Sequence, residues 1–549
     1  MSQCRQCQSS FEIRQQDREF YKKFDAPDPK LCPPCREQRR LSFRNETSLY
    51  KDKCGGCGKG VVTSYSPEMK FKSMCSDCFH ADKIDPMQYG QDFDFNRPFL
   101  EQIEELRDKV PRLSMLTINC ENSDYTSYTA DCKNCYLISA GEKSEDCFYS
   151  RLCQNNNNII DSDYIWDSEL CYECINVSKC YHCFNSFQLE NCNDCHFCFD
   201  LRGCKNCLFS YNLRNKQYYI FNKQHSKEEY ETKLKELNLG SRDAFRKAYE
   251  IWVEMMKKNA IHKGINITNC ENSTGDNLKD DKNMHMCFDM QNSQDCAFCA
   301  EGDAISTYDA NNLYYNPELN LDILSNLASN RISFSMFTFY CNDMQYCDLI
   351  YNSNDLFGCV GLKRKKFCIL NKQYTEEEYR SMRDRIIEHM KKTGEWGEFF
   401  PNTMSHYGYN ESLAYEYYPL ERSEVEANGW KWRDRDSKMS EVEKTVNATE
   451  LPDKIDDVDD EILNWAIKSA KSEDLFKIIP QELEFYKRFG LPLPQLTPFE
   501  RHMERQLLRN PRHIFDRKCD NCHADIKSSY AADRSEKVYC EKCYLTEVY

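Results

Sequence analysis

Short apolar runs separated by polar turn residues dominate the centre of the chain, from about residue 116 to residue 373. Runs such as CYLIS, CFYS, YYIF and FCIL carry aromatic and β-branched residues, which suit strands, and Asn, Asp, Ser and Gly lie between them. Cysteines recur at intervals of 21 residues, as at Cys132, Cys153, Cys174 and Cys195. We interpret each interval as one coil of a β-solenoid, with about five coils in each of two copies.

The two copies are an internal duplication. NCENS at 119–123 opens the first copy and returns at 269–273 in the second. FNKQHSKEEY at 221–230 closes the first copy, and LNKQYTEEEY at 370–379 closes the second. The offset is 150 at the opening and 149 afterwards, so one copy can be used to test the interpretation of the other.

Helical patterns flank both copies. Amphipathic helices are predicted near 98–110 and 244–258, ahead of the two copies. A capping box starts another helix after each copy, Ser226 with Glu229 and Thr375 with Glu378. We expect these helices to cover the open ends of the solenoid, because bare strand edges invite aggregation.

The remaining sequence divides by composition. Residues 394–436 are rich in aromatic residues and are expected to pack across the solenoid or between domains, whereas 437–461 are polar and acidic and are predicted to be a linker. The predicted domains are a double zinc module (1–90), a first solenoid copy (95–240), a second copy (241–393), the aromatic segment with the linker (394–461) and a C-terminal zinc module (462–549). The fold class is therefore mainly β with accessory helices.

Pairs of cysteines in C-x2-C spacing mark both ends of the chain as metal-binding. Residues 469–546 repeat residues 4–81 at an offset of 465, but Ser469, Ser472, Thr497 and Glu500 replace the first four cysteines. Because the first two pairs are lost together and the last two are kept together, sequential pairing of the motifs is predicted. Three zinc ions are expected, on Cys4, Cys7, Cys32 and Cys35; on Cys54, Cys57, Cys75 and Cys78; and on Cys519, Cys522, Cys540 and Cys543.

The other cysteines are expected to fill the solenoid core. Where one copy has Cys195 or Cys207, the other has Met344 or Leu356, and leucine cannot hold a metal ion. The alternative is an iron–sulfur or further zinc site, whose ligands would be sought among the cysteines found in both copies. Those are Cys120 and Cys270, Cys147 and Cys296, Cys192 and Cys341, and Cys198 and Cys347.

Composition limits the environment and the partners. The chain has 34 cysteines but opens with MSQCRQCQSS, which has no apolar signal-peptide core, and no apolar run is long enough for a membrane span. Reduced thiols in the cytoplasm are therefore expected. The net charge of −16 argues against coating of the whole protein by nucleic acid.

Local basic patches nevertheless precede the last two cysteine motifs. Arginines spaced to share one side of a helix occur in both modules: Arg36, Arg39, Arg40 and Arg44, and Arg501, Arg505, Arg509 and Arg512. Such a stripe suits phosphates, and so predicts RNA or DNA binding. The alternatives are a solvated face or an internal dock for acidic groups of the solenoid.

The sequence lacks the motifs of common enzymes. No P-loop, dinucleotide-binding glycine motif, HExxH or G-x-S-x-G elbow is present. The acidic stretch IIDSDYIWDSE at 159–169 is compatible with a solenoid enzyme acting on polysaccharide, the alternative function. At an offset of 149, however, Asp161 and Asp163 fall opposite Ala310 and Asn312.

Two resemblances accompany these motifs. The C-x2-C-x17-C-x2-C spacing resembles GATA-type and other treble-clef zinc modules, which implies binding of nucleic acid or protein. CPPCREQRRL, NKQ-x-[ST]-x-E-E-Y and RKCDNC…YCEKCY resemble uncharacterised zinc-ribbon proteins of candidate-phylum bacteria, a likeness that implies no activity. The expected function is thus a non-enzymatic zinc-binding scaffold that docks RNA or protein through its terminal modules, with no small-molecule cofactor and no membrane partner.

Overall fold

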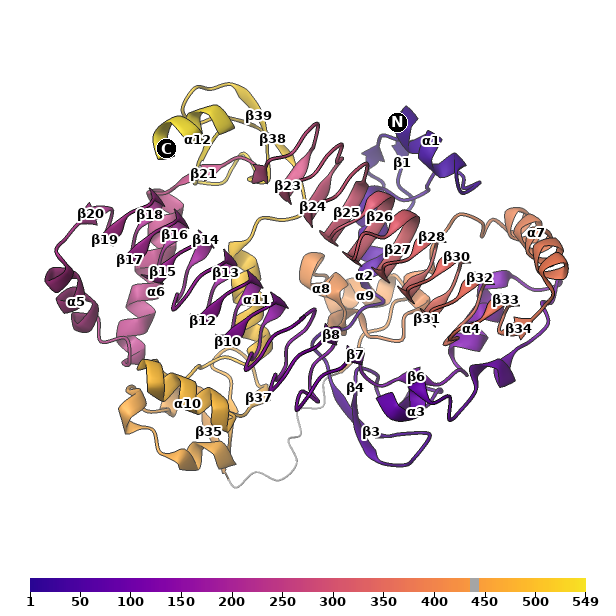
Figure 1. Ribbon diagram of the computed structural model, residues 1–549, viewed down its shortest axis with the longest axis horizontal. Coiled ribbons are helices and arrows are strands. Elements are labelled where there is room, and N and C mark those ends of the chain that lie inside the picture. Colours follow the sequence, from indigo (N-terminus) through magenta and orange to yellow (C-terminus); the bar gives the residue numbers. More distant parts are fainter. Residues whose placement is uncertain (435–443) are drawn as a thin grey trace. The chain divides into compact units, whose positions relative to one another are not determined.

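The computed structural model describes residues 1–434 and 444–549, which form two compact units (Figure 1). Unit 1 comprises residues 1–115, 265–433 and 511–514, and unit 2 comprises 116–264, 434–510 and 515–549. The N-terminal cysteine module therefore lies in the same unit as the second repeat copy. The C-terminal module lies in the same unit as the first copy, so neither unit is a contiguous stretch of sequence.

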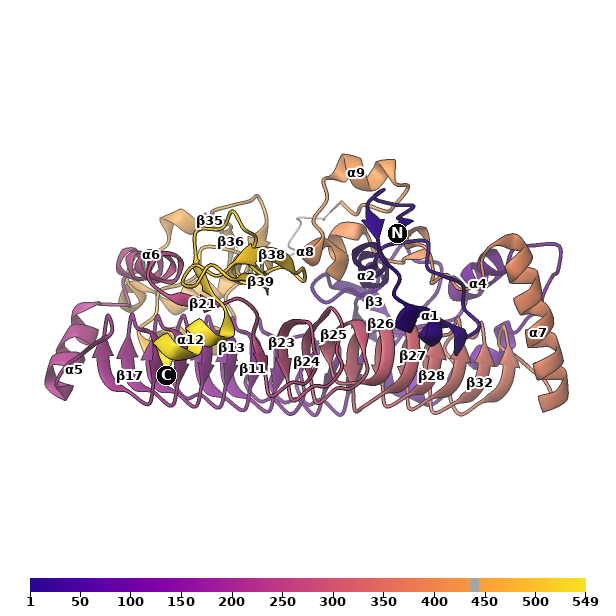
Figure 2. The same ribbon diagram turned by 90° about the horizontal axis from the view of Figure 1, so that it is seen from above.

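Short parallel strands build the first copy. One sheet contains β9 (Arg151–Gln154), β11 (Asp163–Trp166), β13 (Ile175–Ser178), β14 (Phe187–Glu190), β16 (Phe199–Arg202) and β18 (Tyr211–Arg214). Others contain β10 (Asn157–Ile160) with β12 (Glu169–Tyr172), and β15 (Asn193–His196) with β17 (Lys205–Leu208) and β19 (Gln217–Ile220). Neighbouring strands are in register at a shift of 12 residues, as for Asp163 with Ile175, and they lie stacked in Figure 2.

The second copy is built in the same way. It runs through β22 (Ile267–Thr268), β23 (Gly275–Lys279), β24 (Cys287–Gln291), β25 (Ala297–Gly302), β26 (Ile305–Tyr314), β27 (Glu318–Leu327), β28 (Asn330–Ser333), β29 (Met336–Phe339), β30 (Asn342–Gln345), β31 (Asp348–Tyr351), β32 (Asn354–Phe357) and β33 (Lys366–Ile369). The shift is again 12 residues for Asn342 with Asn354. It is 11 where Ala297 pairs with Tyr308 and 13 where Tyr308 pairs with Leu321.

A three-residue rhythm produces the 12-residue turn. Every third residue has a positive φ, as at Asn155 (55°) and Asn158 (54°), so the chain turns a corner after two extended residues. Four such corners complete one turn, and each residue then pairs with the residue twelve positions earlier in the sequence. We call a set of residues paired in this way a column. In one column of the first copy, Ile118, Ala130, Glu142, Gln154, Trp166, Ser178, Glu190, Arg202 and Arg214 follow one another.

The predicted 21-residue coil is therefore wrong. Residues facing the core also recur every third position, and the separations 9, 12 and 21 between cysteines are all multiples of three. The C-x2-C pairs of the repeat copies carry the three-residue spacing, but that spacing alone does not fix the length of a turn at twelve residues.

The three-residue rhythm also explains why the core is rich in cysteine. Polar backbone groups at the inner corners need partners, so small side chains that can donate and accept fit best. Ser162 Oγ donates to the Ile160 carbonyl (3.0 Å) and accepts from the Cys174 N–H (3.0 Å). Cys180 Sγ makes the same pair of contacts, to the Ser178 carbonyl (3.3 Å) and from the Cys192 N–H (3.3 Å). Cysteine thus fills apolar space and still bonds the backbone.

An asparagine amide closes the last turn of each copy. After β33, the chain turns back in β34 (Lys372–Gln373), and Asn371 stands where the next strand would pair. Its Oδ1 accepts from the Val360 N–H (2.8 Å) and its Nδ2 donates to the Val360 carbonyl (2.8 Å). In the first copy, Asn222 pairs with Tyr211 in the same way, beside β20 (Lys223–Gln224). The asparagine of the NKQ motif therefore caps the exposed edge of the last strand layer in each copy.

We expect Asn371→Leu to destabilise the protein by about 2 kcal/mol or more, because the Val360 N–H and carbonyl then stay buried without partners. Asn352→Leu is the matched control, since Asn352 also has a positive φ (47°) but is exposed. Urea unfolding of both variants separates loss of the amide from backbone strain. Equal destabilisation by the two substitutions would contradict the capping role.

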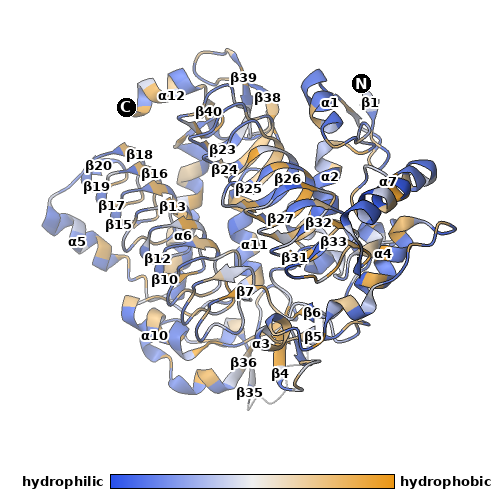
Figure 3. Ribbon diagram, turned by 45° about the vertical axis from the view of Figure 1, so that its right-hand side comes forward, coloured by the Kyte–Doolittle hydropathy of each residue, from blue (hydrophilic) through white to orange (hydrophobic). Residues whose placement is uncertain are grey.

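Helices lie where the patterns predict them. α4 (Phe99–Arg107) and α6 (Arg242–Lys258) precede the copies, and α5 (Lys227–Glu236) and α7 (Glu376–Thr393) follow them. Both predicted capping boxes form, at Ser226 and at Thr375. α7 is largely hydrophilic in Figure 3, in keeping with a helix at the surface of its unit.

The aromatic segment packs as predicted, but the linker does not. Within the described part of 394–436, Phe400 and Leu413 are buried in unit 1, near α8 (Leu413–Tyr417) and α9 (Arg422–Ala427). Residues 435–443 lie outside the described range. The rest of the predicted linker is not free: β35 (Lys444–Asn447) pairs with β36 (Trp465–Lys468), and Leu451 and Ile455 join a buried cluster. Apolar residues spaced among the acidic ones, such as Leu451 and Ile455, make these contacts.

The two terminal modules share one order of elements at the offset of 465. The N-terminal module runs β1 (Ser2–Gln3), β2 (Ser10–Phe11), α1 (Gln15–Lys22), α2 (Pro33–Leu41), β3 (Tyr50–Lys53), β4 (Gly60–Thr63), β5 (Ser73–Met74) and α3 (Ser76–His80). The C-terminal module runs β36, β37 (Leu475–Phe476), α10 (Pro480–Phe489), α11 (Pro498–Leu508), β38 (Phe515–Lys518), β39 (Asp525–Ser528), β40 (Lys537–Tyr539) and α12 (Glu541–Val548).

Strand pairing ties each module to the segment that leads into a repeat copy. β5 pairs in parallel with β6 (Arg112–Leu113), just ahead of the first copy, and β40 pairs with β21 (Ile261–Lys263), just ahead of the second.

Candidate metal centres and arginine docks

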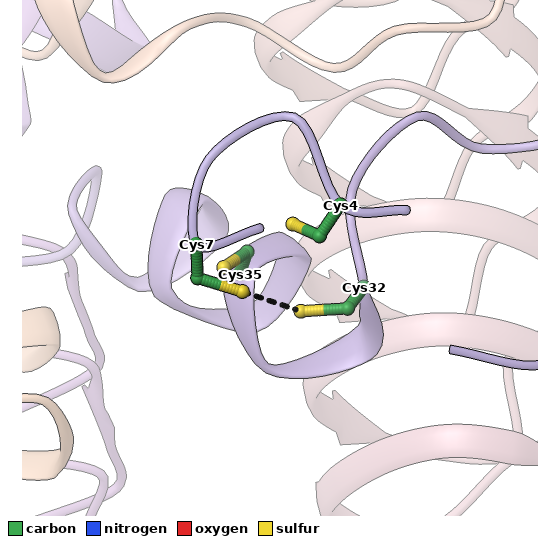
Figure 4. Close-up of side chains that lie close together, drawn as sticks. All are labelled: Cys4, Cys7, Cys32 and Cys35. Carbon is green, nitrogen blue, oxygen red and sulfur yellow. Dashed lines mark hydrogen bonds between the residues drawn. The ribbon is translucent and has the colours of Figure 1, made fainter. Parts of the chain in front are cut away.

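Four cysteines converge between the β1–β2 turn and the start of α2. Cys4 and Cys7 lie in the turn, Cys32 is the N-cap of α2, and Cys35 lies in its first turn (Figure 4). Their sulfurs all lie within 4.8 Å of one another, and Cys7 and Cys32 Sγ are 3.6 Å apart. A tetrahedral zinc–thiolate centre places its sulfurs ~3.8 Å apart, so the four side chains fit one ion.

The other two predicted sets converge in the same way. In the second set, Cys57 and Cys75 Sγ are 3.9 Å apart, and in the C-terminal set Cys522 and Cys540 Sγ are 3.8 Å apart. One pair lies in a hairpin turn and the other at a helix N-terminus in each case. The sequential pairing of the motifs is thereby confirmed.

Backbone amides favour the thiolate form in these sets. The N–H groups of Gly56 and Cys75 donate to Cys54 Sγ, at 3.4 and 3.2 Å. Burial alone would raise the pKa of Cys54, but these donors lower it to about 6. In the C-terminal set the Cys540 N–H donates to Cys519 Sγ (3.2 Å), and the pKa of Cys519 is likewise lowered, against the effect of burial, to about 6. Thiolates are the form that binds metal ions.

A hydrogen-bonded cluster occupies the place of the lost fourth centre. Ser469 Oγ donates to Glu500 Oε2 (2.6 Å), and Thr497 and Glu500 form the capping box that starts α11. Burial would raise the pKa of Glu500, but hydrogen bonds from Ser469, Ser472 and Thr497 lower it. The hydroxyl and carboxylate groups thus hold together the two segments that a metal ion would otherwise bridge. Phe476, Ile478, Phe485 and Tyr486 are buried in one apolar cluster of this unit, and Phe489 is partly buried against it.

In unit 1 the predicted arginine stripe of α2 is buried against the second repeat copy. Arg36, Arg39 and Arg40 are each at most 5% exposed. Arg36 Nε donates to Asp309 Oδ1 (2.8 Å), while Arg39 Nη2 and Arg40 Nη1 donate to the two oxygens of Asp322 (2.6 and 3.0 Å). The face is an internal dock, not an exposed stripe, and nucleic-acid binding by these residues stays a prediction.

In unit 2 the corresponding helix, α11, docks on the first copy. Arg505 Nε donates to Asp163 Oδ2 (2.8 Å), and its Nη1 lies 3.4 Å from Asp161 Oδ1. Arg501 Nε lies 3.1 Å from Asp161 Oδ1, and Arg501 Nη1 lies 3.5 Å from Glu482 Oε1. All five side chains are at most 5% exposed.

The two docks are copies of each other. Arg501 and Arg505 correspond to Arg36 and Arg40 at the offset of 465. Asn311 Oδ1 accepts from Arg40 Nε (3.0 Å), and in the other unit Asp163 Oδ2 accepts from Arg505 Nε. The 11-residue step at Ala297 moves the local offset between copies to 148, so Asp161 corresponds to Asp309. The expectation that the second copy loses the leading acid is therefore wrong.

Arg44 and its counterpart Arg509, 465 residues later, also have partners inside their units. Arg44 donates from Nε to Glu46 Oε1 (2.5 Å) and from Nη1 to Ser325 Oγ (2.6 Å). The guanidinium of Arg509 lies 3.4 Å from the centre of the Tyr164 ring.

Arg512 belongs to unit 1, not to the dock of α11. Its Nη1 donates to Glu37 Oε1 (2.9 Å), its Nη2 bonds Glu301, and Asp289 Oδ2 lies 3.5 Å away. All eight predicted arginines are thus engaged within the folded units. The sequence did not identify the individual acidic partners of these arginines, because most of them lie hundreds of residues away along the chain.

The dock of unit 2 holds an excess of acid. Asp161, Asp163, Glu173 and Glu482 face Arg501, Arg505 and His502, whose Nδ1 lies 3.2 Å from Asp163. Burial raises the pKa of Glu173 to about 8, although Arg505 opposes the shift. Glu173 therefore binds a proton in the folded state at neutral pH.

We expect Glu173→Gln to flatten the pH dependence of stability. Below about 4.3, the ordinary Glu pKa, the carboxyl is protonated whether folded or not; between that value and about 8 only the unfolded chain ionises, so rising pH favours unfolding. The glutamine removes this loss and should raise the free energy of unfolding by about 1 kcal/mol or more at pH 8.5, with little change at pH 4. Urea unfolding across that range is the measurement. An unchanged pH profile would contradict protonation of Glu173.

The cysteines of the repeat copies fill the two cores, as the first interpretation predicted. Burial raises the pKa of Cys341 to about 12, which keeps its thiol protonated. In the described residues, the groups of three or more metal-ligating side chains that converge within 4.8 Å are the three terminal sets. The cysteines common to both copies do not join such a group.

Comparisons with known proteins identify no family. No protein-family model matches the chain, and no curated protein matches it. A crystal structure described as a "putative acetyltransferase from Desulfovibrio desulfuricans G20" is similar at 8% identity over 50% of this chain and 81% of that one, with a TM-score of 0.11. A similarity of that TM-score carries no argument about fold or function. In the described residues, no helix is both long and apolar enough to cross a membrane.

Proposed function

We propose that the protein is a non-enzymatic scaffold in which two β-solenoid copies are each locked to a zinc-binding module. The 12-residue register and the corner at every third residue are what a four-sided solenoid requires. The order of hairpin turn and helix N-terminus in each cysteine set is that of treble-clef modules. Four thiolates at tetrahedral spacing favour zinc over the harder cations Mg²⁺ and Ca²⁺.

The duplicated arginine dock is the observation that carries this proposal. In both units the helix of a terminal module inserts guanidinium groups between acids of a repeat copy, and those acids are buried. A polysaccharide-cleaving solenoid needs carboxyl groups that reach the sugar. Asp161 and Asp163 are 0% exposed and bound to arginine, so they offer no support for the enzymatic alternative.

A protein partner fits the structure better than RNA. Of the eight arginines predicted to contact phosphate, seven pair with carboxylates and Arg509 packs on Tyr164. The net charge of the chain is −16. The test uses full-length protein with a generic single-stranded RNA at low ionic strength, and no salt-dependent binding is expected. Salt-dependent binding by the folded, zinc-loaded protein, with a log–log salt slope near about −3, would favour RNA instead.

Elemental analysis of the purified protein should find three zinc ions per chain. Titration of released zinc during mild thiol modification should show that twelve cysteines account for them. One zinc or none would contradict the scaffold proposal. Iron with visible charge-transfer absorbance would contradict the core-filling role of the cysteines in the repeat copies.

A further inference from the structure

The three cysteine sets differ in how far solvent reaches their side chains. In each N-terminal set one cysteine is exposed, Cys7 or Cys57, and the other three are at most 6% exposed. In the C-terminal set Cys519 is 0% exposed. The other three cysteines of that set are exposed or partly exposed: Cys522, Cys540 and Cys543. Reagents in solution can therefore reach three of its four thiols, against one of four in each N-terminal set.

The C-terminal set lacks a methionine that lies beside the second set. Met74 is 1% exposed, and a Cβ placed on Gly56 would lie 3.0 Å from its methyl carbon and 3.1 Å from Cys78 Sγ. At the offset of 465, Tyr539 stands in place of Met74 and is itself partly exposed. Asn521 stands in place of Gly56 and is exposed. The apolar packing that shields the second set is thus absent from its C-terminal counterpart.

The C-terminal set also positions the helix that docks its module on the first repeat copy. Cys540 is the N-cap of α12, Cys543 lies in the first turn, and Tyr544 follows directly. The Tyr544 hydroxyl accepts from Arg214 Nη2 (2.6 Å) and donates to Asp200. Asp200 and Arg214 also pair with each other (3.0 Å), and Tyr544 is 6% exposed. A metal ion on this set would therefore hold Tyr544 in its buried contact.

We propose that the C-terminal set is an oxidation site, at which a peroxide converts Cys522 and Cys540 to a disulfide and the metal ion is released. Cysteines react with peroxides when they are thiolates and accessible, and zinc-bound cysteines of this set would be both. Cys522 and Cys540 Sγ are 3.8 Å apart, so a disulfide bond of ~2.0 Å requires little movement. The inference rests on the proposed zinc-binding function and adds a class of reactant to it.

Cys522 and Cys540 would react in two balanced steps, with hydrogen peroxide as the oxidant. The Cys522 thiolate attacks one peroxide oxygen, the O–O bond breaks, and a sulfenic acid forms as hydroxide leaves. The Cys540 thiolate attacks that sulfur, an S–S bond forms, and a second hydroxide leaves. The two sulfurs lose two electrons to the peroxide, and the two hydroxides take up two protons to become water. Cys519 and Cys543 are then too few to hold the ion of a four-cysteine centre.

Loss of the ion should loosen α12 from the first repeat copy. Once Cys540 is bonded to Cys522 and the metal is gone, only packing holds the start of the helix. Tyr544 can then leave Asp200 and Arg214, which lie on β16 and β18. A thiol reductant and added zinc should reverse the change, because disulfide exchange regenerates both thiolates.

The experiment adds hydrogen peroxide to full-length protein carrying three zinc ions and follows released zinc with a chromogenic chelator. One zinc ion per chain should be released about tenfold faster or more than the other two, because the N-terminal sets are better covered. Peptide mapping at that stage should find the disulfide within residues 519–543 and reduced cysteines within residues 4–78. Hydrogen exchange should increase in α12 and stay unchanged in α3, the equivalent helix of the second set.

Cys522→His keeps a fourth zinc ligand but removes one of the two thiolates that would form the disulfide. This variant should still bind three zinc ions and should lose the fast release. Cys120→Ser is the control, because Cys120 is a partly exposed thiol that belongs to none of the three sets. It should leave the fast release unchanged. Should Cys522→His fail to hold its zinc ion, peptide mapping of the native protein decides the question.

Equal release of all three ions, or earlier release from an N-terminal set, would overturn the proposal. Fast release without a disulfide within residues 519–543 would also overturn it, and so would fast release from zinc-loaded Cys522→His protein. Each of these results leaves the scaffold function standing. Fewer than three zinc ions in the untreated protein would instead reject the zinc-binding function on which the inference rests.

Discussion

Replacing Cys57 with serine should unfold the second cysteine set of the N-terminal module. Cys57 supplies one of four converging sulfurs, and serine is a far poorer zinc ligand. Metal binding provides the folding free energy of small zinc modules, about 10–16 kcal/mol. We expect one zinc ion fewer per chain and early proteolysis within residues 50–83.

The matched control makes the same substitution in the core of the first repeat copy. Cys198 Sγ donates to the carbonyls of His196 (3.2 Å) and Cys207 (3.5 Å). Ser186 and Ser210, twelve residues on either side, already make the equivalent bonds. Cys198→Ser should therefore cost less than about 1.5 kcal/mol and leave three zinc ions bound.

Cys195→Met extends this comparison, since Met344 occupies the corresponding place in the second copy and is 0% exposed. Overpacking should cost about 1–3 kcal/mol, which the fold should survive. If Cys57→Ser and the two core substitutions were equally damaging, the division into metal ligands and core residues would be refuted.

Arg505→Met should destabilise unit 2 by about 3–5 kcal/mol at pH 7, because it leaves buried acids without their cation. Arg505 contacts Asp161, Asp163 and Glu173, at 3.4, 2.8 and 3.4 Å. The loss should shrink as pH falls towards about 4, since the acids then take up protons and no longer need the guanidinium. Urea unfolding at several pH values measures both effects.

Arg246→Met is the control for the same change at the surface. Arg246 pairs with Asp243 and Glu250 on α6, and its side chain is 58% exposed. An exposed pair of this kind contributes about 0–1 kcal/mol, so the variant should unfold almost as the native protein does. A small effect of Arg505→Met that does not vary with pH would mean that the dock is held by packing alone.

The sequence predicted those features that are local or that the two copies test against each other. The capping boxes at Ser226 and Thr375 follow from residues three apart, and the same boxes are seen in the structure. The grouping of Cys4 with Cys32, and of Cys54 with Cys75, followed from the pairs lost and kept in the C-terminal module. It needed no three-dimensional information.

The turn length and the docks were decided by tertiary structure. The separations 9, 12 and 21 all preserve a three-residue rhythm, so cysteine spacing by itself did not show that the chain returns to its column after twelve residues. An arginine on a helix looks the same in sequence whether it meets water, phosphate or a buried acid. Only the fold brings Arg40 to Asp322 across 282 residues, and a charge can be buried there because its partner arrives with it.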